Sequence, residues 1–243
     1  MSSMVKIELF GGAIVSVLPY GCFSDVSQVR QVPDNQEVFL YTKSESDIAL
    51  IVDLIDSSST AGMTDEEAAA FYYADLAAIN SNRQNESASE SVILSSYSYM
   101  AQQNPSLYKI FPTISSSYGR LSLVGVQRVR KGRAIADEDI TQNKNQGEDV
   151  VVILAMIRLT NVSTDLIVTL SIPINAIFAS SAHFNDETTW TECIPNVEEL
   201  LFTAAERHTT PPLALKNDFL TTTQALRVFL DNLEIVNWSL FAA

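Results

Sequence analysis

Two long apolar runs separated by a short polar segment constrain the fold of this chain more than any other feature. Val150–Leu159 and Leu166–Ile172 are rich in β-branched residues, and the polar segment Thr160–Asp165 lies between them. β-Branched side chains favour strands, and a connection this short joins antiparallel neighbours. The pattern therefore predicts an antiparallel hairpin, whose second strand ends at Pro173 because proline has no N–H to donate to a ladder.

Further strand signals occur between the N-terminus and residue 130. Each is a short run of apolar and β-branched residues bounded by turn-forming residues. We expect strands at Ala13–Leu18, Gln36–Tyr41, Ile48–Ile55 and Leu121–Val129, and short strand pieces around Val92–Leu94.

A helix start is marked by a hydroxyl and a carboxylate three residues apart. Thr64 and Glu67 form a capping-box pattern, in which each side chain satisfies a free backbone N–H of the first turn. The apolar spacing that follows predicts a helix to about Asn80, with Phe71 and Tyr72 packed in the core. A helix is also predicted over Thr221–Leu233, and residues 197–206 are a candidate for another.

The order of these elements indicates the fold class. Strands dominate and the helices fall outside any strict strand–helix alternation, which favours an α+β layer architecture with a largely antiparallel sheet. With 243 residues and a hydrophobic fraction of 47%, one domain over 1–243 is expected, with loop-like extra segments near 81–119 and 175–216. Residues 7–60 and 150–172 should then share one sheet.

The charge balance excludes some partners. The net charge is −14, and residues 1–100 hold fourteen acidic and four basic side chains. A chain with this balance is a poor ligand for phosphates, so we expect no nucleic-acid binding and no binding to an anionic membrane. An acidic N-terminal half suits a basic partner, although a role in solubility explains the charge equally well.

Signals for targeting, metal binding and catalysis are sparse. The start has no basic and apolar leader and no run is long enough to span a bilayer, so we expect a soluble protein of a reducing compartment. Cys22 and Cys193 are too few for a disulfide framework, and Cys22 is expected to be a small buried residue. His183 and His208 lie in polar segments without metal-site spacing, and Arg128–Arg133 is best explained as a solvated strand end, with an import signal or an anion site as the alternatives. We therefore predict a protein that is not an enzyme and has no cofactor or metal.

Two aspartates interrupt an otherwise apolar strand. Asp53 and Asp56 lie in IALIVDLID, where a buried strand favours apolar side chains throughout. Their odd spacing places them on opposite faces if the strand continues through both. Two hypotheses have equal weight: a partner-binding pair, or a strand end at which Asp56 caps the turn into Ser57.

Several segments together resemble the Mog family of Ran guanine nucleotide release factors. They are Leu9–Ile14 (LFGGAI), Asp25–Phe39 (DVSQVRQVPDNQEVF), Leu50–Asp56 (LIVDLID), Met156–Leu170 (MIRLTNVSTDLIVTL) and the terminal Ser239–Phe241 (SLF). The resemblance implies an α/β/α sandwich, in which a central twisted, mainly antiparallel sheet is flanked by helices, related to the PsbP fold. It also implies binding of the small GTPase Ran, release of its guanine nucleotide and support of nuclear protein import.

The resemblance also implies a set of partner-binding residues. The family's acidic pair carries over to Asp53 and Asp56, and the second member is commonly Glu in the family, so Asp56 is one methylene shorter. Asp34 and Glu37 of the VPDNQE string and Asp25 of DVS match family positions that we expect near the same surface.

The resemblance places the protein in a cellular setting. We expect a monomer in the nucleus and cytoplasm whose partners are Ran and other Ran-binding proteins. Three alternatives remain: an adaptor that binds Ran without changing nucleotide release, a PsbP-like photosynthetic subunit, for which a lumenal targeting peptide is missing, and an enzyme built on a pair such as Asp53 and His183.

Overall fold

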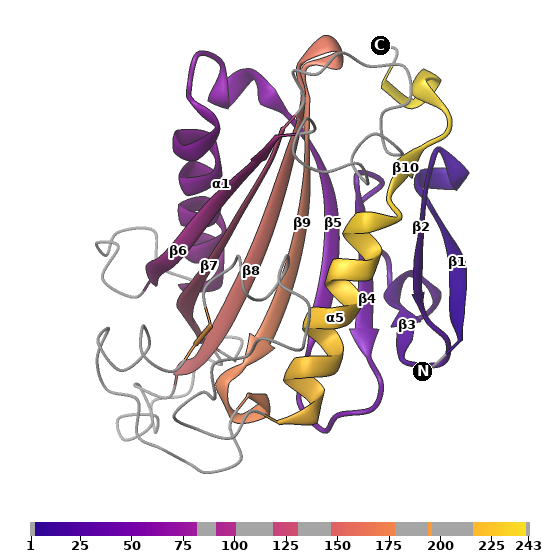
Figure 1. Cartoon of the computed structure of the whole chain (residues 1–243), viewed down its shortest axis with the longest axis vertical. Helices are drawn as coiled ribbons and strands as arrows, with labels where there is room; N and C mark the ends of the chain where they lie inside the picture. The colour runs from indigo at the N-terminus through magenta and orange to yellow at the C-terminus, as the bar shows by residue number, and fades with distance from the viewer. Residues whose placement is uncertain are drawn as a thin grey trace, which may run out of the picture.

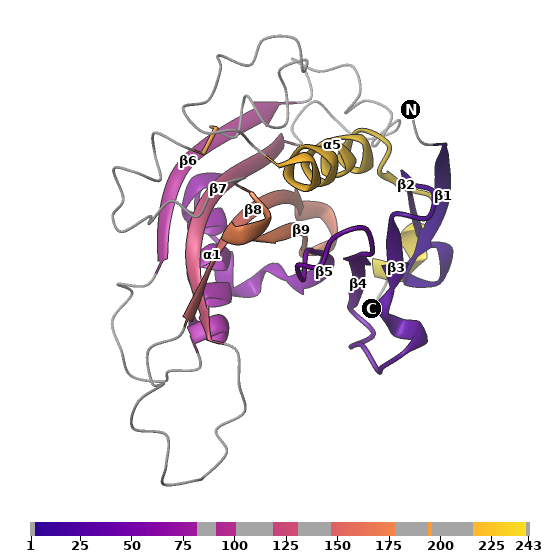
Figure 2. The same ribbon diagram turned by 90° about the horizontal axis from the view of Figure 1, so that it is seen from below.

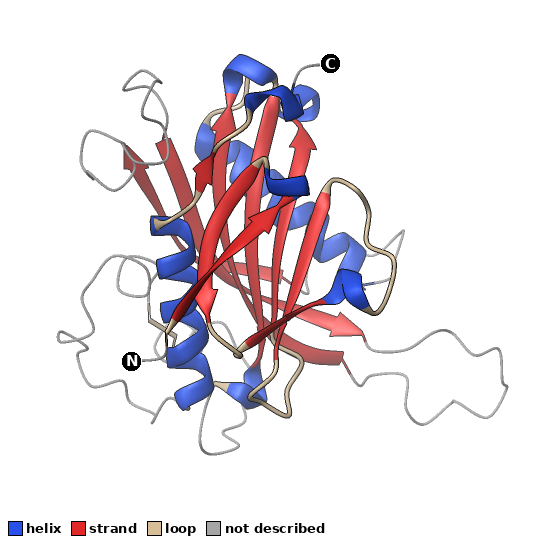
Figure 3. Cartoon of the chain, turned by 90° about the vertical axis from the view of Figure 1, so that its right-hand side faces the viewer, coloured by secondary structure: helices blue, strands red, loops and turns tan. Residues whose placement is uncertain are grey.

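The computed structural model describes residues 3–81, 91–100, 119–130, 147–177, 194–195 and 216–241. Within these residues, seven strands form one large sheet in the order β3-β4-β5-β9-β8-β7-β6 (Figure 1). All neighbouring strands of this sheet are antiparallel. Its strands are β3 (Phe23–Asp25), β4 (Gln36–Tyr41), β5 (Ala49–Asp56), β6 (Ser91–Met100), β7 (Gly119–Arg130), β8 (Gly147–Leu159) and β9 (Thr164–Pro173). The sheet is strongly twisted, as the fanning of its strands in Figure 3 shows.

The predicted hairpin of β8 and β9 is confirmed and forms the middle of the large sheet. A single 3-10 turn, η5 (Thr160–Val162), and Ser163 in the left-handed conformation (φ 49°) connect the strands. Val151, Val152, Ile153 and Leu154 of β8 are each no more than 1% exposed. Both faces of β8 are therefore covered, which explains why its sequence is continuously apolar and does not alternate.

The two long helices among the described residues lie on opposite faces of the large sheet (Figure 2). Helix α1 (Asp65–Ser81) packs over β6, β7 and β8, and helix α5 (Asn217–Asp231) covers the other face. Alternate residues of β8 supply the two cores, with Val152 and Leu154 on the side of α1 and Val151 and Ile153 on the side of α5. The predicted α/β/α sandwich is thereby confirmed.

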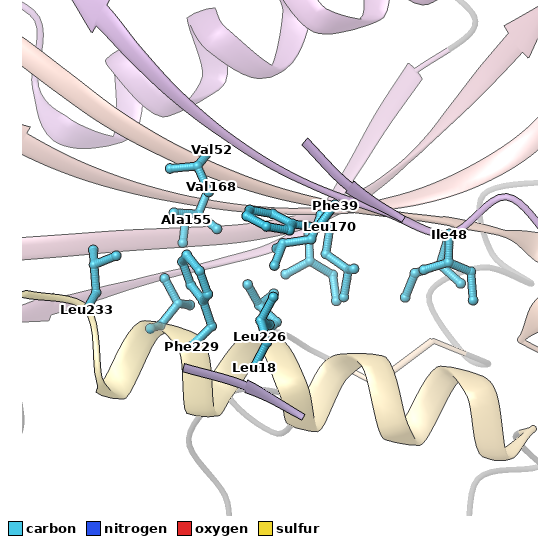
Figure 4. Close-up of a cluster of buried hydrophobic side chains, with 14 of the residues drawn as sticks. Leu18, Phe39, Ile48, Val52, Ala155, Val168, Leu170, Leu226, Phe229 and Leu233 are labelled. Carbon is cyan, nitrogen blue, oxygen red and sulfur yellow. The ribbon is translucent and has the colours of Figure 1, made fainter. Parts of the chain in front are cut away.

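Phe229 and Leu226 anchor α5 to the sheet. Figure 4 shows them pointing at Val168, Leu170 and Phe39. All five side chains belong to one buried cluster and are at most 6% exposed. At about 25 cal/mol per Å² of buried apolar surface, such side chains stabilise the folded state by roughly 1.5–3 kcal/mol each.

A smaller sheet lies beside the large one and corrects one prediction. Strand β2 (Ile14–Pro19) pairs with β1 (Met4–Leu9) on one side and with β10 (Glu234–Ile235) on the other. The expectation that residues 7–60 share one sheet with 150–172 is therefore right for β4 and β5 but wrong for β1 and β2. The reason is that β10 occupies the second edge of β2, and β2 packs instead on α5, where the Ser16 hydroxyl donates to the Phe229 carbonyl (2.6 Å).

The start of α1 follows the predicted capping box. The Thr64 amide donates to Glu67 Oε2 (2.8 Å), and the Glu67 amide donates to the Thr64 hydroxyl (3.2 Å).

The prediction for Phe71 is wrong, because this ring is 39% exposed, whereas Tyr73 is 2% exposed. Tyr73 takes the buried position because its hydroxyl reaches the carbonyls of two sheet strands, whereas Phe71 stays at the rim of α1 against the Tyr72 ring (centroids 5.6 Å apart).

Some of the remaining predictions concern residues that the structure describes, and the others fall outside those residues. Cys22 is buried, as expected, and its thiol is free. Arg128 is an exposed strand-end residue that pairs with Asp149 across β7 and β8 (2.9 Å), which supports the solvated-strand-end explanation. No helix in the described ranges is long and apolar enough to cross a membrane. The candidate helix at 197–206, both histidines and Cys193 lie outside the described residues.

Candidate partner-binding site

The five acidic residues expected at the partner surface lie on β3, β4 and β5 or in the turns beside them. Antiparallel pairing brings the start of β4 next to the end of β5, at the end of the sheet that also carries the β8–β9 connection. This end is at the top of Figure 1. We call Asp34, Asp53 and Asp56, which lie here, the acidic rim.

Asp53 is a half-buried carboxylate with one clear partner. It lies opposite Gln36 in the register of β4 and β5, and Gln36 Nε2 donates to its Oδ1 (2.7 Å). Burial raises the pKa of Asp53, and the Gln36 hydrogen bond partly offsets that effect. Ionisation of this carboxyl therefore carries a desolvation cost, which a cationic partner group would relieve.

Asp56 is an exposed carboxylate at the last position of β5. Its Oδ1 accepts from the Ser58 amide (2.7 Å) and caps the 3-10 turn η3 (Ser57–Thr60), and this hydrogen bond lowers the pKa of Asp56. The turn-capping hypothesis is therefore observed. It does not compete with partner binding, because the capping carboxylate remains exposed to solvent.

Asp53 and Asp56 point to opposite faces, because β5 continues through both. They are three positions apart along the strand, which is a distance of about 10 Å. They therefore flank the end of β5 from two sides and do not form a close pair.

The VPDNQE string forms the turn that leads into β4. Asn35 Nδ2 donates to the Leu54 carbonyl (3.0 Å) and the Leu54 amide donates to the Asn35 carbonyl (2.9 Å). These bonds tie the turn to β5 just before Asp56 and leave Asp34 exposed at its tip. The exposed carboxylates of the acidic rim are thus Asp34 and Asp56.

Glu37 and Asp25 hold backbone groups in place. Glu37 Oε1 accepts from the Phe10 amide (2.6 Å) in the turn η1 (Phe10–Gly12), where Phe10 has φ +50°. The LFGG and VPDNQE strings, which are distant in sequence, are therefore in direct contact. Asp25 Oδ1 accepts from the Ser27 amide (2.8 Å) and caps the turn η2 (Val26–Gln28).

Asp25 stands apart from the acidic rim. It pairs with Phe39 in the register, three residues along β4 from Gln36, which is about 10 Å away. The structure therefore brings together Asp34, Asp53 and Asp56, connects Glu37 to the other sheet, and leaves Asp25 at a distance.

A buried polar cluster beneath η3 escaped the sequence analysis. It consists of Thr60, Tyr72, Arg158 and Asp165, of which Asp165 is 1% exposed. The Tyr72 hydroxyl donates to Asp165 Oδ2 (2.7 Å), and burial is the main cause that raises the pKa of Tyr72 to about 12. The sequence does contain one indication of this cluster, which is the acidic residue Asp165 at the start of the apolar run Asp165–Ile172. A charge that enters a buried strand needs a partner.

The arrangement offers charge and hydrogen-bond acceptors but no metal centre. Among the residues that the structure describes, no three His, Cys, Asp or Glu side chains are grouped closely enough to hold a metal ion. The acidic rim and its capped turns are suited to contact with donors on another macromolecule.

The fold defines the class of protein first. The crystal structure of the Ran-binding protein Mog1p from Saccharomyces cerevisiae superposes on it with a TM-score of 0.57 over 99% of this chain and 100% of that chain, at 20% sequence identity. This is the α/β/α sandwich of Mog1p. The family described as Ran-interacting Mog1 protein matches residues 7–173, and the chain belongs to this family.

Named relatives agree with this assignment. The chain is 30% identical over 185 residues to the Ran guanine nucleotide release factor of Danio rerio, covering 75% of this chain and 87% of that protein. It is 31% identical over 169 residues to the Homo sapiens protein of the same name (68% and 74% covered). It is 26% identical over 186 residues to the nuclear import protein MOG1 of Saccharomyces cerevisiae (73% and 70% covered). The family resemblance seen in the sequence is confirmed.

Proposed function

We propose that this protein binds the small GTPase Ran, promotes release of its bound guanine nucleotide and thereby supports nuclear protein import. The observation that carries the proposal is that the acidic rim lies inside the segment matched by the Ran-interacting family, residues 7–173. The names of the relatives, Ran guanine nucleotide release factor and nuclear import protein, support the same function.

Nucleotide release needs only differential binding. A partner that binds the nucleotide-free state of a GTPase more tightly than the loaded state lowers nucleotide affinity by the same factor. About 1.4 kcal/mol of differential binding weakens nucleotide retention tenfold. No covalent step is involved, so the protein acts as a non-catalytic regulator and needs no cofactor.

The acidic rim supplies recognition in this mechanism. Asp34 and Asp56 are exposed and attract a basic surface at a distance, and Asp53 meets a donor in a partly desolvated position. Exposed charges of this kind raise association rates and fix orientation more than they raise affinity. We propose that the protein acts as a monomer in the nucleus and cytoplasm, with Ran and other Ran-binding proteins as partners.

A nucleotide-release assay tests the proposal. Purified protein is mixed with Ran that carries a fluorescent guanine nucleotide, and the fluorescence decay is followed in excess unlabelled nucleotide. We expect release faster than the spontaneous rate, with a rate that rises and saturates with protein concentration. Ran binding in a pull-down with release at the spontaneous rate would support an adaptor and contradict the release activity.

A further inference from the structure

The partly buried Arg158 and the buried Asp165 lie outside the acidic rim but hold the segment that presents Asp56. We infer that this pair positions the η3 turn and its Asp56 carboxylate, and that the partner recognises the geometry so imposed. The inference rests on the proposed binding of Ran and adds two residues to which no binding role has been assigned.

The pair sits at the turn end of the β8–β9 hairpin, where the two residues are register partners. Arg158 Nε lies 3.5 Å from Asp165 Oδ1. Asp165 Oδ2 accepts from the Tyr72 hydroxyl (2.7 Å) and from the Thr60 hydroxyl (3.0 Å). A buried carboxylate is tolerated only with such compensation, so Thr60 and Tyr72 are drawn to Asp165.

The guanidinium of Arg158 fixes the other end of the same segment. Its Nη2 donates to the Thr60 carbonyl (3.0 Å) and its Nη1 donates to the Met63 carbonyl (2.8 Å). Nη1 also lies 3.5 Å from Asp65 Oδ1, at the start of α1. The planar fork of Arg thus attaches the connection between η3 and α1 to β8, which Lys could not do in the same geometry.

A chain of hydrogen bonds leads from Thr60 to Asp56. The Thr60 hydroxyl shares its proton between Asp165 and the Ser57 carbonyl (3.1 Å). The Ser57 amide donates to the Ser163 carbonyl (2.9 Å), and the Ser58 amide donates to Asp56 Oδ1 (2.7 Å). The direction of the Asp56 carboxylate therefore depends on an η3 backbone that Arg158 and Asp165 hold at its far end.

A double-mutant cycle separates positioning from general stability. Asp165→Asn and Tyr72→Phe are each made alone and together with Asp56→Ala, and Ran affinity is measured at a temperature where all variants are folded. We expect each to weaken binding by roughly fivefold to tenfold when Asp56 is present, and by less than about twofold when it is absent. Equal losses in both backgrounds would overturn the inference.

Asp149→Asn is the matched control. It makes the same substitution in a cross-strand Arg–Asp pair of the same sheet, between β7 and β8, that does not touch η3. We expect it to leave Ran affinity unchanged, and a loss equal to that of Asp165→Asn would contradict a specific role for the buried pair.

A second readout does not depend on Ran. Hydrogen exchange of the Ser58 amide should accelerate in Asp165→Asn and Tyr72→Phe, and the pKa of Asp56 measured by NMR should move up towards its ordinary value. If Asp165→Asn fails to fold, Tyr72→Phe decides alone, because it removes one hydroxyl and keeps the ring. Unchanged Ser58 exchange would overturn the inference even if binding falls. If the wild-type protein does not bind Ran, the proposed function fails, and Ser58 exchange still decides whether the buried pair positions the turn.

Discussion

The two aspartates of β5 show how one residue type takes two roles three positions apart. Asp53 is half-buried against Gln36, and its pKa is raised by burial. Asp56 is exposed, and its pKa is lowered by the Ser58 amide. Substitutions at the two positions should therefore change stability in opposite directions while both weaken binding.

Asp53→Asn should stabilise the fold near neutral pH while it weakens Ran binding. Because the folded pKa is raised, the stability contributed by this carboxyl is present below the unfolded pKa and is lost as pH rises through the folded pKa. Asn carries no charge to desolvate and still accepts from Gln36, so urea unfolding should show a gain of up to about 1 kcal/mol at about pH 7 that vanishes near about pH 3. A variant less stable than wild type at neutral pH would refute this account.

Asp56→Ala should lower both the stability of the fold and the affinity for Ran. Asp56→Glu should lower the stability slightly without lowering the affinity. Ala removes both the cap on Ser58 and the exposed charge. Glu restores the longer side chain common in the family but caps the turn less well, so we expect a slightly lower melting temperature with Ran affinity at least equal to that of the wild type. Thermal unfolding and titration calorimetry measure the two quantities. Normal Ran binding by a folded Asp56→Ala protein would remove Asp56 from the site.

At the scale of elements, Gly125 is the point where α1 meets the large sheet. The Tyr73 hydroxyl lies 2.9 Å from the carbonyls of both Val92 and Val126 and bridges β6 to β7 where the register shifts between Ile93 and Ser95. A Cβ at position 125 would collide with the Tyr73 hydroxyl and the Val92 carbonyl.

Gly125→Ala should therefore destabilise the protein by about 1–3 kcal/mol, the range for overpacking a core. Denaturant unfolding monitored by far-UV circular dichroism gives the free energy. Gly62→Ala is not a suitable control, because Gly62 has φ +83° and an alanine there would be strained. The comparison is Ala78→Gly, a substitution in helix α1 that costs about 1 kcal/mol through helix propensity. If Gly125→Ala is as stable as the wild type, the prediction is wrong, because β6 and β7 can then move apart at this point to make room for the added methyl group.

Elements with a local signal could be predicted from the sequence, and elements defined by distant partners could not. The bounds of β4 and the capping box of α1 match the predictions, because an apolar run that follows a turn and a helix cap are both local patterns. Strand β1 was missed because its side chains are mostly exposed, with Lys6 and Glu8 among its residues, and β3 has only three residues. The Arg158–Asp165 pair needed the hairpin register, which only the structure supplies.

At the scale of the whole molecule, we expect charge to govern the approach of the partner. Because residues 1–100 carry most of the net negative charge, association with Ran should slow as ionic strength rises, since the screening length falls to about 8 Å near physiological salt. Stopped-flow association rates between low and high salt measure this. A rate independent of salt would remove long-range attraction from the mechanism and leave the contacts of the acidic rim to account for binding.

The chain should also behave as one domain. Glu37 joins the two sheets through Phe10, and β2 packs on α5, so the small sheet has no core of its own. Limited proteolysis should cut in those parts of 81–119, 137–149 and 175–216 that lie outside strands β6 and β8, where the composition is that of loops, and should not release two fragments that are each stably folded. Two separately folded halves would contradict a single domain.

The pairing of β10 with β2 has a consequence for how the protein is made. Ile235 pairs with Ile14, so the small sheet joins segments that are far apart in the sequence. During translation β2 is synthesised long before β10, so one hydrogen-bonding edge of β2 stays open until residues 234 and 235 have been made. An unpaired strand edge is a site for aggregation. A ribosome stalled before residue 234 therefore displays a nascent chain that a chaperone would need to shield until β10 pairs with β2.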